Sequence, residues 1–190
     1  RQMCIRDSLL AAEDEMVFSL AAEGNSEELG EALQDFPDIN KTDTNGMTLL
    51  LNAVLYGNLK NTVALLEAGA DPEISNGLVL NPLFLAIRNG DTELVDILLD
   101  KGADSEAQIE DGSTPLIFAS MLGELGVVRN LLNRGVNVEA QTANGESALI
   151  AASFEGHLGI VRLLLDQGAD IESVNQEGFT SVIAAASNGY

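Results

Sequence analysis

The sequence has little of the chemistry that metal sites, disulfides and nucleophilic catalysis require. Its 190 residues include one cysteine, Cys4, and one histidine, His157. A disulfide within the chain is therefore impossible, and so is a zinc site built from cysteine and histidine ligands. A chain without disulfides fits a reducing compartment, so we expect an intracellular, cytoplasmic protein.

Basic and aromatic residues are also scarce. Nine lysines and arginines stand against 30 aspartates and glutamates, a formal net charge of -21, and aromatic residues make up 4% of the chain. Such a charge repels phosphate backbones and anionic lipids, which argues against nucleic acids and membranes as partners. It suits a basic protein partner. The alternative, which we favour on composition alone, is that the acidity only keeps an elongated protein soluble or reflects a salty environment.

Long apolar runs are missing as well, and none approaches the roughly 20 residues that span a bilayer. What the chain has instead is repetition with a period of 33 residues. A repeat of this length indicates a solenoid of stacked units. Three registers share the step: Gly24, Gly57, Gly90, Gly123, Gly156 and Gly189; Gly69, Gly102, Gly135 and Gly168; Ala53, Ala86, Ala119, Ala152 and Ala185.

Each unit predicts a hairpin tip followed by two short antiparallel helices. An Asn-Gly or Asp-Gly pair, such as Asn144-Gly145, forms the tip because glycine tolerates positive φ. A capping side chain then starts the first helix, which ends at a left-handed glycine such as Gly123. A second helix with apolar residues at helical spacing runs to the next glycine. The predicted caps are Thr48, Asn81, Thr114, Ser147 and Thr180, with Pro82 and Pro115 at the first helical position.

Several segments resemble the ankyrin repeat almost as written. They are Thr114-Pro115-Leu116, Gly156-His157-Leu158-Gly159-Ile160-Val161-Arg162-Leu163-Leu164 and Gly168-Ala169-Asp170-Ile171. The resemblance implies an all-α solenoid of stacked helix-turn-helix units with hairpin tips, over residues 10–190. We expect repeats at about 10–42, 43–75, 76–108, 109–141 and 142–174, and a truncated sixth at 175–190. Residues 1–9 resemble a non-native leader, and the truncated sixth repeat predicts a fragment of a longer array.

The chain also departs from the family pattern. Ankyrin repeats usually carry a histidine that bonds between repeats, at the position that here holds an apolar residue. We therefore expect apolar packing to replace that polar network at Leu51, Phe84, Ile117, Ile150 and Ile183. The first repeat lacks its hairpin and closing glycines, with Phe36 at the closing position, so we expect a degenerate or capping unit. The third has Asn76-Gly77 two residues early, which predicts an irregular tip.

No residue set predicts catalysis, a cofactor or a metal. His157 follows a helix-ending glycine, where the repeat itself favours histidine, and no nucleophile or orienting carboxylate is evident. The acidic run Glu13-Asp14-Glu15 lacks the spacing and central glycine of a calcium loop, and the glycines match no phosphate-binding loop. We expect no enzyme, and interpret His157 as a polar residue between two helices.

The resemblance instead implies a protein-binding scaffold whose concave side, formed by hairpin tips and first helices, contacts the partner. We expect the chain to be a monomer. Carried over by position, the predicted partner-binding residues are Met47, Leu55, Tyr56, Leu80, Arg88, Met121, Leu122, Phe154 and Phe179. Three alternatives remain at this point. These side chains could pack locally and serve stability, the array could be a spacer, or it could be the regulatory or substrate-recruiting module of a larger enzyme or channel.

Overall fold

The computed structural model describes residues 14–75 and 81–190. The leader, Cys4, Leu80 and the third hairpin tip at residues 76–80 lie outside the described residues. The chain divides into two compact units, residues 1–103 and 104–190, and each is described by itself.

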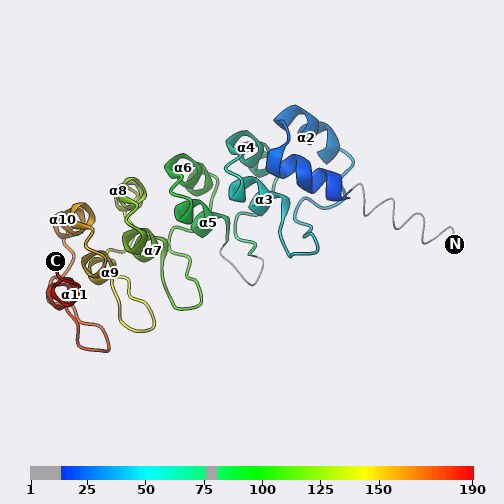
Figure 1. The fold of residues 1–190 in the computed structure, drawn as a ribbon. Helices are drawn as coiled ribbons and strands as arrows, with labels where there is room; N and C mark the ends of the chain where they lie inside the picture. The colour runs from blue at the N-terminus through cyan, green and yellow to red at the C-terminus, as the bar shows by residue number, and fades with distance from the viewer. Residues whose placement is uncertain (1–13, 76–80) are drawn as a thin grey trace. The chain divides into compact units, whose positions relative to one another are not determined.

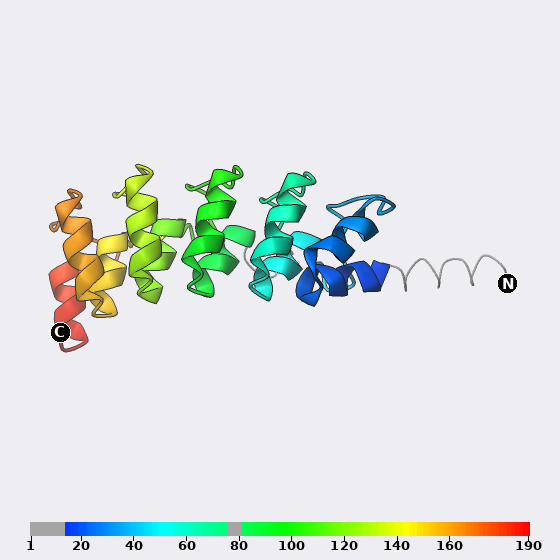
Figure 2. The ribbon, with the colours of Figure 1, turned by 90° about the horizontal axis from the view of Figure 1, so that it is seen from above.

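Both units are built from short helices in two layers (Figures 1 and 2). In the first unit, α3 (Leu49–Leu55) and α5 (Pro82–Arg88) are first helices, and α2 (Ser26–Leu33), α4 (Leu59–Glu67) and α6 (Thr92–Asp100) are second helices. A helix that includes residues 14–23 precedes α2. In the second unit, α7 (Pro115–Leu122), α9 (Ala148–Phe154) and α11 (Ser181–Ser187) are first helices, and α8 (Leu125–Asn133) and α10 (Leu158–Asp166) are second helices. Apart from isolated bridges, the described residues form no strand, so the all-α repeat solenoid is confirmed.

The helices α3, α5, α7, α9 and α11 begin directly after the predicted capping residues. Helices of seven or eight residues are marginal alone, so their free N–H groups need partners and their apolar faces need neighbours. The five predicted cap side chains each accept a bond from the N–H three residues later; the pairs are Thr48 with Leu51, Asn81 with Phe84, Thr114 with Ile117, Ser147 with Ile150, and Thr180 with Ile183. Pro82 and Pro115 open α5 and α7, as predicted.

The core is aliphatic and lies between stacked first helices and between the two layers. Four residues at the usual histidine position are buried, with 1–2% of each exposed: Leu51, Phe84, Ile117 and Ile150. At these positions apolar packing replaces the polar network, as expected. Ile183 of α11 is the exception and is 47% exposed, because α11 stacks on α9 with one side and no other helix among the described residues packs on its opposite side.

The hairpin tips close with backbone bonds and then stack on one another within the second unit. Gly112 shows why a glycine is needed at a tip, because its φ is 83° and an added Cβ would lie 2.9 Å from Ala143 N. The Ala143 N–H donates to Asp111 O at 2.8 Å, so neighbouring tips approach closely enough for backbone pairing. A side chain at this glycine would force the two tips apart.

The first repeat is a helix pair whose end is packed differently from that of the later repeats. Phe36 stands where a closing glycine is expected, and its ring packs edge-on against Phe18 with centroids 6.2 Å apart. Gly24 belongs to the period-33 series but, unlike Gly123, does not adopt a positive φ. The first repeat thus differs from the later ones in the turn at Gly24 and in the packing of Phe36.

Candidate functional site

Most of the predicted partner-binding side chains are exposed in their own units. In the first unit, Leu55 is 39% exposed, Tyr56 is 58% exposed and Arg88 is exposed, all at the ends of α3 and α5. Met47 is half-buried in its tip. Leu55, Tyr56 and Arg88 protrude because they lie at the end of a first helix, one or two residues before the left-handed glycine.

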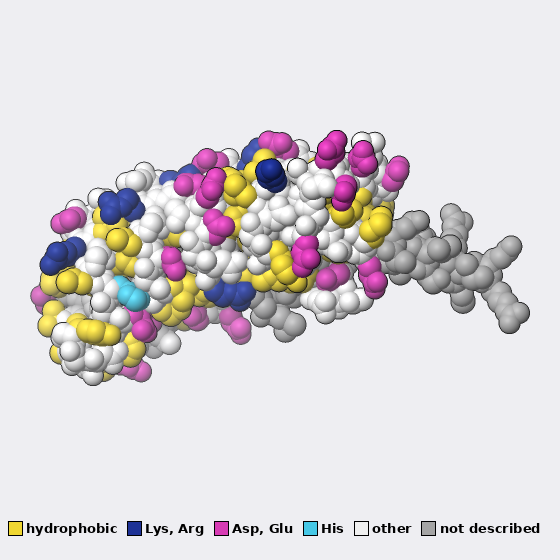
Figure 3. All heavy atoms as spheres, turned by 45° about the horizontal axis from the view of Figure 1, so that its top comes forward, with side chains coloured by type: hydrophobic (Ala, Val, Ile, Leu, Met, Phe, Trp, Pro, Cys, Tyr) yellow, Lys and Arg dark blue, Asp and Glu magenta, His cyan; other side chains and the backbone are white. Residues whose placement is uncertain are grey.

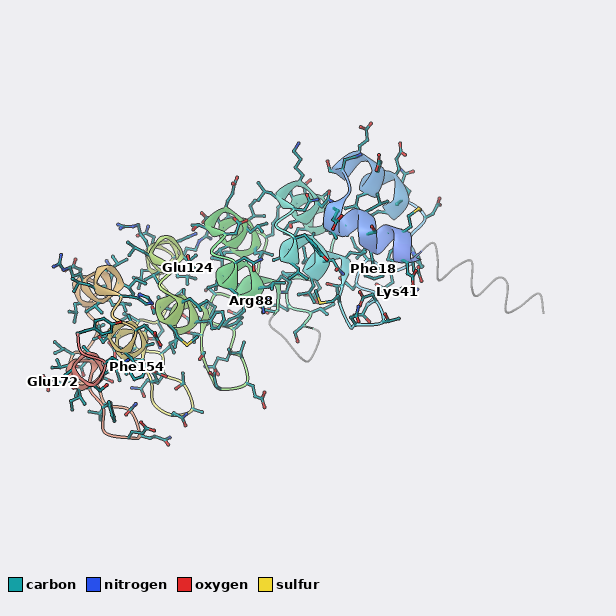
Figure 4. All side chains as sticks on the ribbon, in the orientation of Figure 1. Phe18, Lys41, Arg88, Glu124, Phe154 and Glu172 are labelled. Carbon is teal, nitrogen blue, oxygen red and sulfur yellow. The ribbon has the colours of Figure 1, made fainter. Side chains whose placement is uncertain are left out.

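The second unit repeats this arrangement. Met121 and Leu122 end α7 with 41% and 38% exposed, and Phe154 ends α9 with 42% exposed. Phe179 lies half-buried in the last tip. Figure 4 labels Arg88 and Phe154 at equivalent positions of their repeats, one in each unit.

The structure brings Phe154 and Phe179 together in one cleft of the second unit. The cleft has a volume of about 570 Å³ and lies between the tips and first helices of the fifth and sixth repeats. Its lining residues are Asn144, Glu146, Ile150, Phe154, Asn175, Gln176, Glu177, Phe179 and Ala184. The sequence placed the two phenylalanines on the same side of the array without indicating that they share a cavity.

Hydrogen bonds between the two repeats hold this cleft in shape. Gln176 donates from its backbone N to Asn144 O at 2.9 Å and from Nε2 to Ala143 O at 2.8 Å. At the other end, Asn188 Nδ2 donates to Phe154 O at 2.6 Å. The two repeats are therefore hydrogen-bonded to each other at both ends of the cleft.

The electrostatics of the cleft are acidic. The pKa of Glu146 is raised above its usual value, first by burial of the carboxyl group and then by repulsion from Asp111, Glu155 and Glu177. Three other carboxylates thus lie near enough to disfavour the charge of Glu146. Acidic side chains are also spread over the face drawn in Figure 3, with hydrophobic side chains exposed between them.

His157 connects two repeats. Its Nε2 lies 3.2 Å from Met121 O, and its ring covers Gly123 so closely that an added Cβ there would lie 2.7 Å from the ring. Asn58, Asn89 and Asn188 likewise donate to carbonyls at the end of the preceding first helix. This geometry fits the interpretation of His157 as a polar residue that connects helices.

Metal-binding clusters and membrane-spanning helices are both absent from the part of the chain that the structure describes. In residues 14–75 and 81–190, no three His, Cys, Asp or Glu side chains gather in a way that could hold a metal ion. None of the helices in this part of the chain is both long enough and apolar enough to span a bilayer.

Sequence reasoning missed two sets of structural polar residues. Asn61 and Thr62 are fully buried in α4, where the following repeats carry apolar pairs such as Leu94 and Val95. This pair of polar residues at positions that are apolar in the following repeats could have been recognised from the sequence. The recurring acids also have a local structural role, because Asp71, Asp104 and Asp170 each accept a bond from the N–H two residues later. These carboxylates therefore stabilise turns in addition to carrying surface charge.

Comparison with known proteins agrees with this architecture. The family model for ankyrin repeats (three copies) matches residues 65–142 and 127–190. A comparison with curated proteins gave no match. Ankyrin repeats are generally protein–protein interaction modules, and the family is typically non-catalytic. The matched residues cover well over half of the sequence, so the chain belongs to the ankyrin-repeat family.

Proposed function

We propose that the chain binds another protein through its hairpin tips and the exposed ends of its first helices, and that it catalyses no reaction. The observation that carries this proposal is the exposure of large apolar side chains at one repeat position. Leu55, Met121 and Phe154 are each separated by a multiple of the 33-residue period, and each is about two-fifths exposed. Exposed apolar side chains that gather next to charged ones are typical of interaction surfaces.

The neighbouring position supports the same proposal. Tyr56 and Leu122 follow Leu55 and Met121 and are also exposed, so each of these helices ends in an apolar pair. Aromatic side chains such as Tyr56 and Phe154 contribute most to binding energy when a partner buries them. A specific interface needs about 800 Å² from each partner, an area that several tips and helix ends can supply.

Site-specific photo-crosslinking in lysate of the source cells tests this proposal. A photoreactive residue is introduced as Tyr56→p-benzoyl-phenylalanine or Leu122→p-benzoyl-phenylalanine. The matched controls are the same change at exposed second-helix positions, Lys60 in α4 and Leu165 in α10. We expect a discrete crosslinked protein from the first-helix positions and none from the controls. Equal crosslinking at both kinds of position, or none at either, would contradict the proposal.

A further inference from the structure

The cleft between the fifth and sixth repeats has a chemistry that selects its occupant. Phe154, Phe179 and Ile150 supply apolar walls, and Glu146 and Glu177 supply carboxylates at the hairpin tips. The apolar stem of a long side chain fits the apolar walls, and a positive charge at the end of that stem fits the carboxylates.

The second unit offers no cation of its own to this surface. Residues 104–190 contain twelve acidic residues and three arginines, Arg129, Arg134 and Arg162, and no lysine. Arg129 and Arg162 lie on α8 and α10, and Arg134 follows α8 directly, so all three belong to the layer of second helices. Tips and first helices of this unit thus carry acidic charge without basic charge.

Glu146 is the half-buried acid of the cleft lining. No ion pair to its carboxylate forms within the described residues. Burial raises its pKa most, and repulsion from Asp111, Glu155 and Glu177 raises it further; a positive charge in the cleft would offset that repulsion. An anionic occupant would add to that repulsion, and a purely apolar one would bury the carboxylates without a partner.

We infer that this cleft binds an arginine or lysine side chain from an extended segment of the partner protein. The cation lies against the rings of Phe154 and Phe179 and pairs with Glu146 and Glu177. Cations bind to aromatic faces within about 6 Å of the ring centre, and charge-assisted hydrogen bonds to carboxylates add orientation. This inference rests on the proposed protein-binding function and names the chemistry of the partner at one site.

The test uses the ¹⁵N-labelled chain and a small probe. Nα-acetyl-arginine amide is titrated while ¹H–¹⁵N spectra are recorded, and Nα-acetyl-citrulline amide serves as the neutral probe of matching shape. We expect saturable shifts at the amides of Glu146, Glu177 and Phe179 with the arginine probe, and binding at least about fivefold weaker with citrulline. Nα-acetyl-lysine amide should shift the same amides.

Matched variants separate a defined site from general attraction to an acidic protein. E146Q/E177Q removes two charges from the cleft, and D166N/E172Q removes two from exposed positions of the same unit outside it. We expect the first variant to bind the arginine probe at least about fivefold more weakly and the second to bind like the wild type. The spectra themselves show whether each variant is folded, and Gln and Asn keep the size of the groups they replace.

Three results would overturn the inference: equal binding of the arginine and citrulline probes, no saturable shift, or an equal loss in both double variants. None of these would decide the proposed function, because its crosslinks start from Tyr56 and Leu122, which do not line the cleft. If crosslinks form but the arginine probe does not bind, the chain still binds a protein, but that partner places no basic side chain in this cleft.

Discussion

Asn61 offers the sharpest test of how one repeat stabilises the next. This amide is fully buried in α4 at the position that the following repeats fill with Leu94, Val127 and Ile160. Its Nδ2 lies 2.8 Å from Leu20 O, 3.1 Å from Ala21 O and 3.0 Å from Gly24 O. The last carbonyls of a helix have no partner within that helix, so Asn61 caps the helix of the preceding repeat from outside.

The expected cost of Asn61→Ala follows from these bonds. The amide has two protons, so two good bonds are lost at about 0.5–1.5 kcal/mol each. The carbonyls of Leu20 and Gly24 each keep a second donor, the Gly24 N–H and Asn58 Nδ2, so the loss falls mainly on Ala21. Removal of Asn61 Oδ1, which is buried without a partner among the described residues, recovers part of the cost. The two bonds sum to about 1–3 kcal/mol, and the recovery brings the expected net destabilisation to about 1–2 kcal/mol.

Asn61→Leu separates hydrogen bonding from volume. Leucine restores the apolar residue of the third repeat but donates no hydrogen bond, so Ala21 O loses its Asn61 donor and Leu20 O and Gly24 O each lose one of two donors. We therefore expect this variant also to be less stable than the wild type, by roughly 1–2 kcal/mol. Leu94→Ala, at the equivalent position of α6, should cost about 2–5 kcal/mol because it leaves a cavity in an apolar core.

Urea denaturation followed by circular dichroism gives the three values, and hydrogen exchange locates the loss. Amides of residues 14–23 should exchange faster in both Asn61 variants, because stability in repeat arrays depends on nearest neighbours. If Asn61→Leu were as stable as the wild type or more stable, the three bonds would contribute nothing net, and this account of the first repeat would be wrong.

Three further changes test the helix ends, the turns and the acidic cleft. Gly123→Ala should destabilise by at least about 1–3 kcal/mol in urea denaturation, because φ is 83° and the new Cβ would meet the ring of His157. Thr114→Ala should cost about 1 kcal/mol in the same assay through loss of a helix cap. Because the pKa of Glu146 is raised in the folded state, its ionisation opposes folding at neutral pH, so E146Q should be more stable than the wild type there. That difference in stability should vanish as pH falls through the Glu146 pKa. Urea midpoints measured at several pH values test this, and an E146Q variant less stable than the wild type at neutral pH would contradict it.

The sequence predicts the fold well where the determinants are local. A cap such as Thr114 acts on the N–H three residues later, and Gly123 adopts its left-handed turn within its own repeat. Both effects depend on a few neighbouring residues, and the 33-residue period shows each of them several times. The predicted first helix from Pro115 to Leu122 is therefore confirmed to the residue.

The site is less predictable because it depends on how repeats stack. Phe154 and Phe179 are 25 positions apart, and the space between them depends on bonds and packing between the fifth and sixth repeats. The raised pKa of Glu146 likewise depends on Asp111 and Glu177, which belong to the repeats on either side. Asn61 was visible as a polar residue in an apolar register, but its acceptors lie about 40 positions earlier.

The first helices carry two separate sets of apolar side chains, one buried in the core and one exposed at the helix ends. Leu51 and Leu55 lie one helical turn apart on α3, yet Leu51 is 1% exposed and Leu55 is 39% exposed. The residues that replace the usual histidine fill the space between first helices, while the residues at the helix ends remain outside it. The alternative that the predicted binding residues pack locally does not fit Tyr56, which is 58% exposed, or Phe154, which is 42% exposed. Stability and the exposed surface thus depend on different residues of the same short helices, so the surface can vary between repeats while the solenoid is kept.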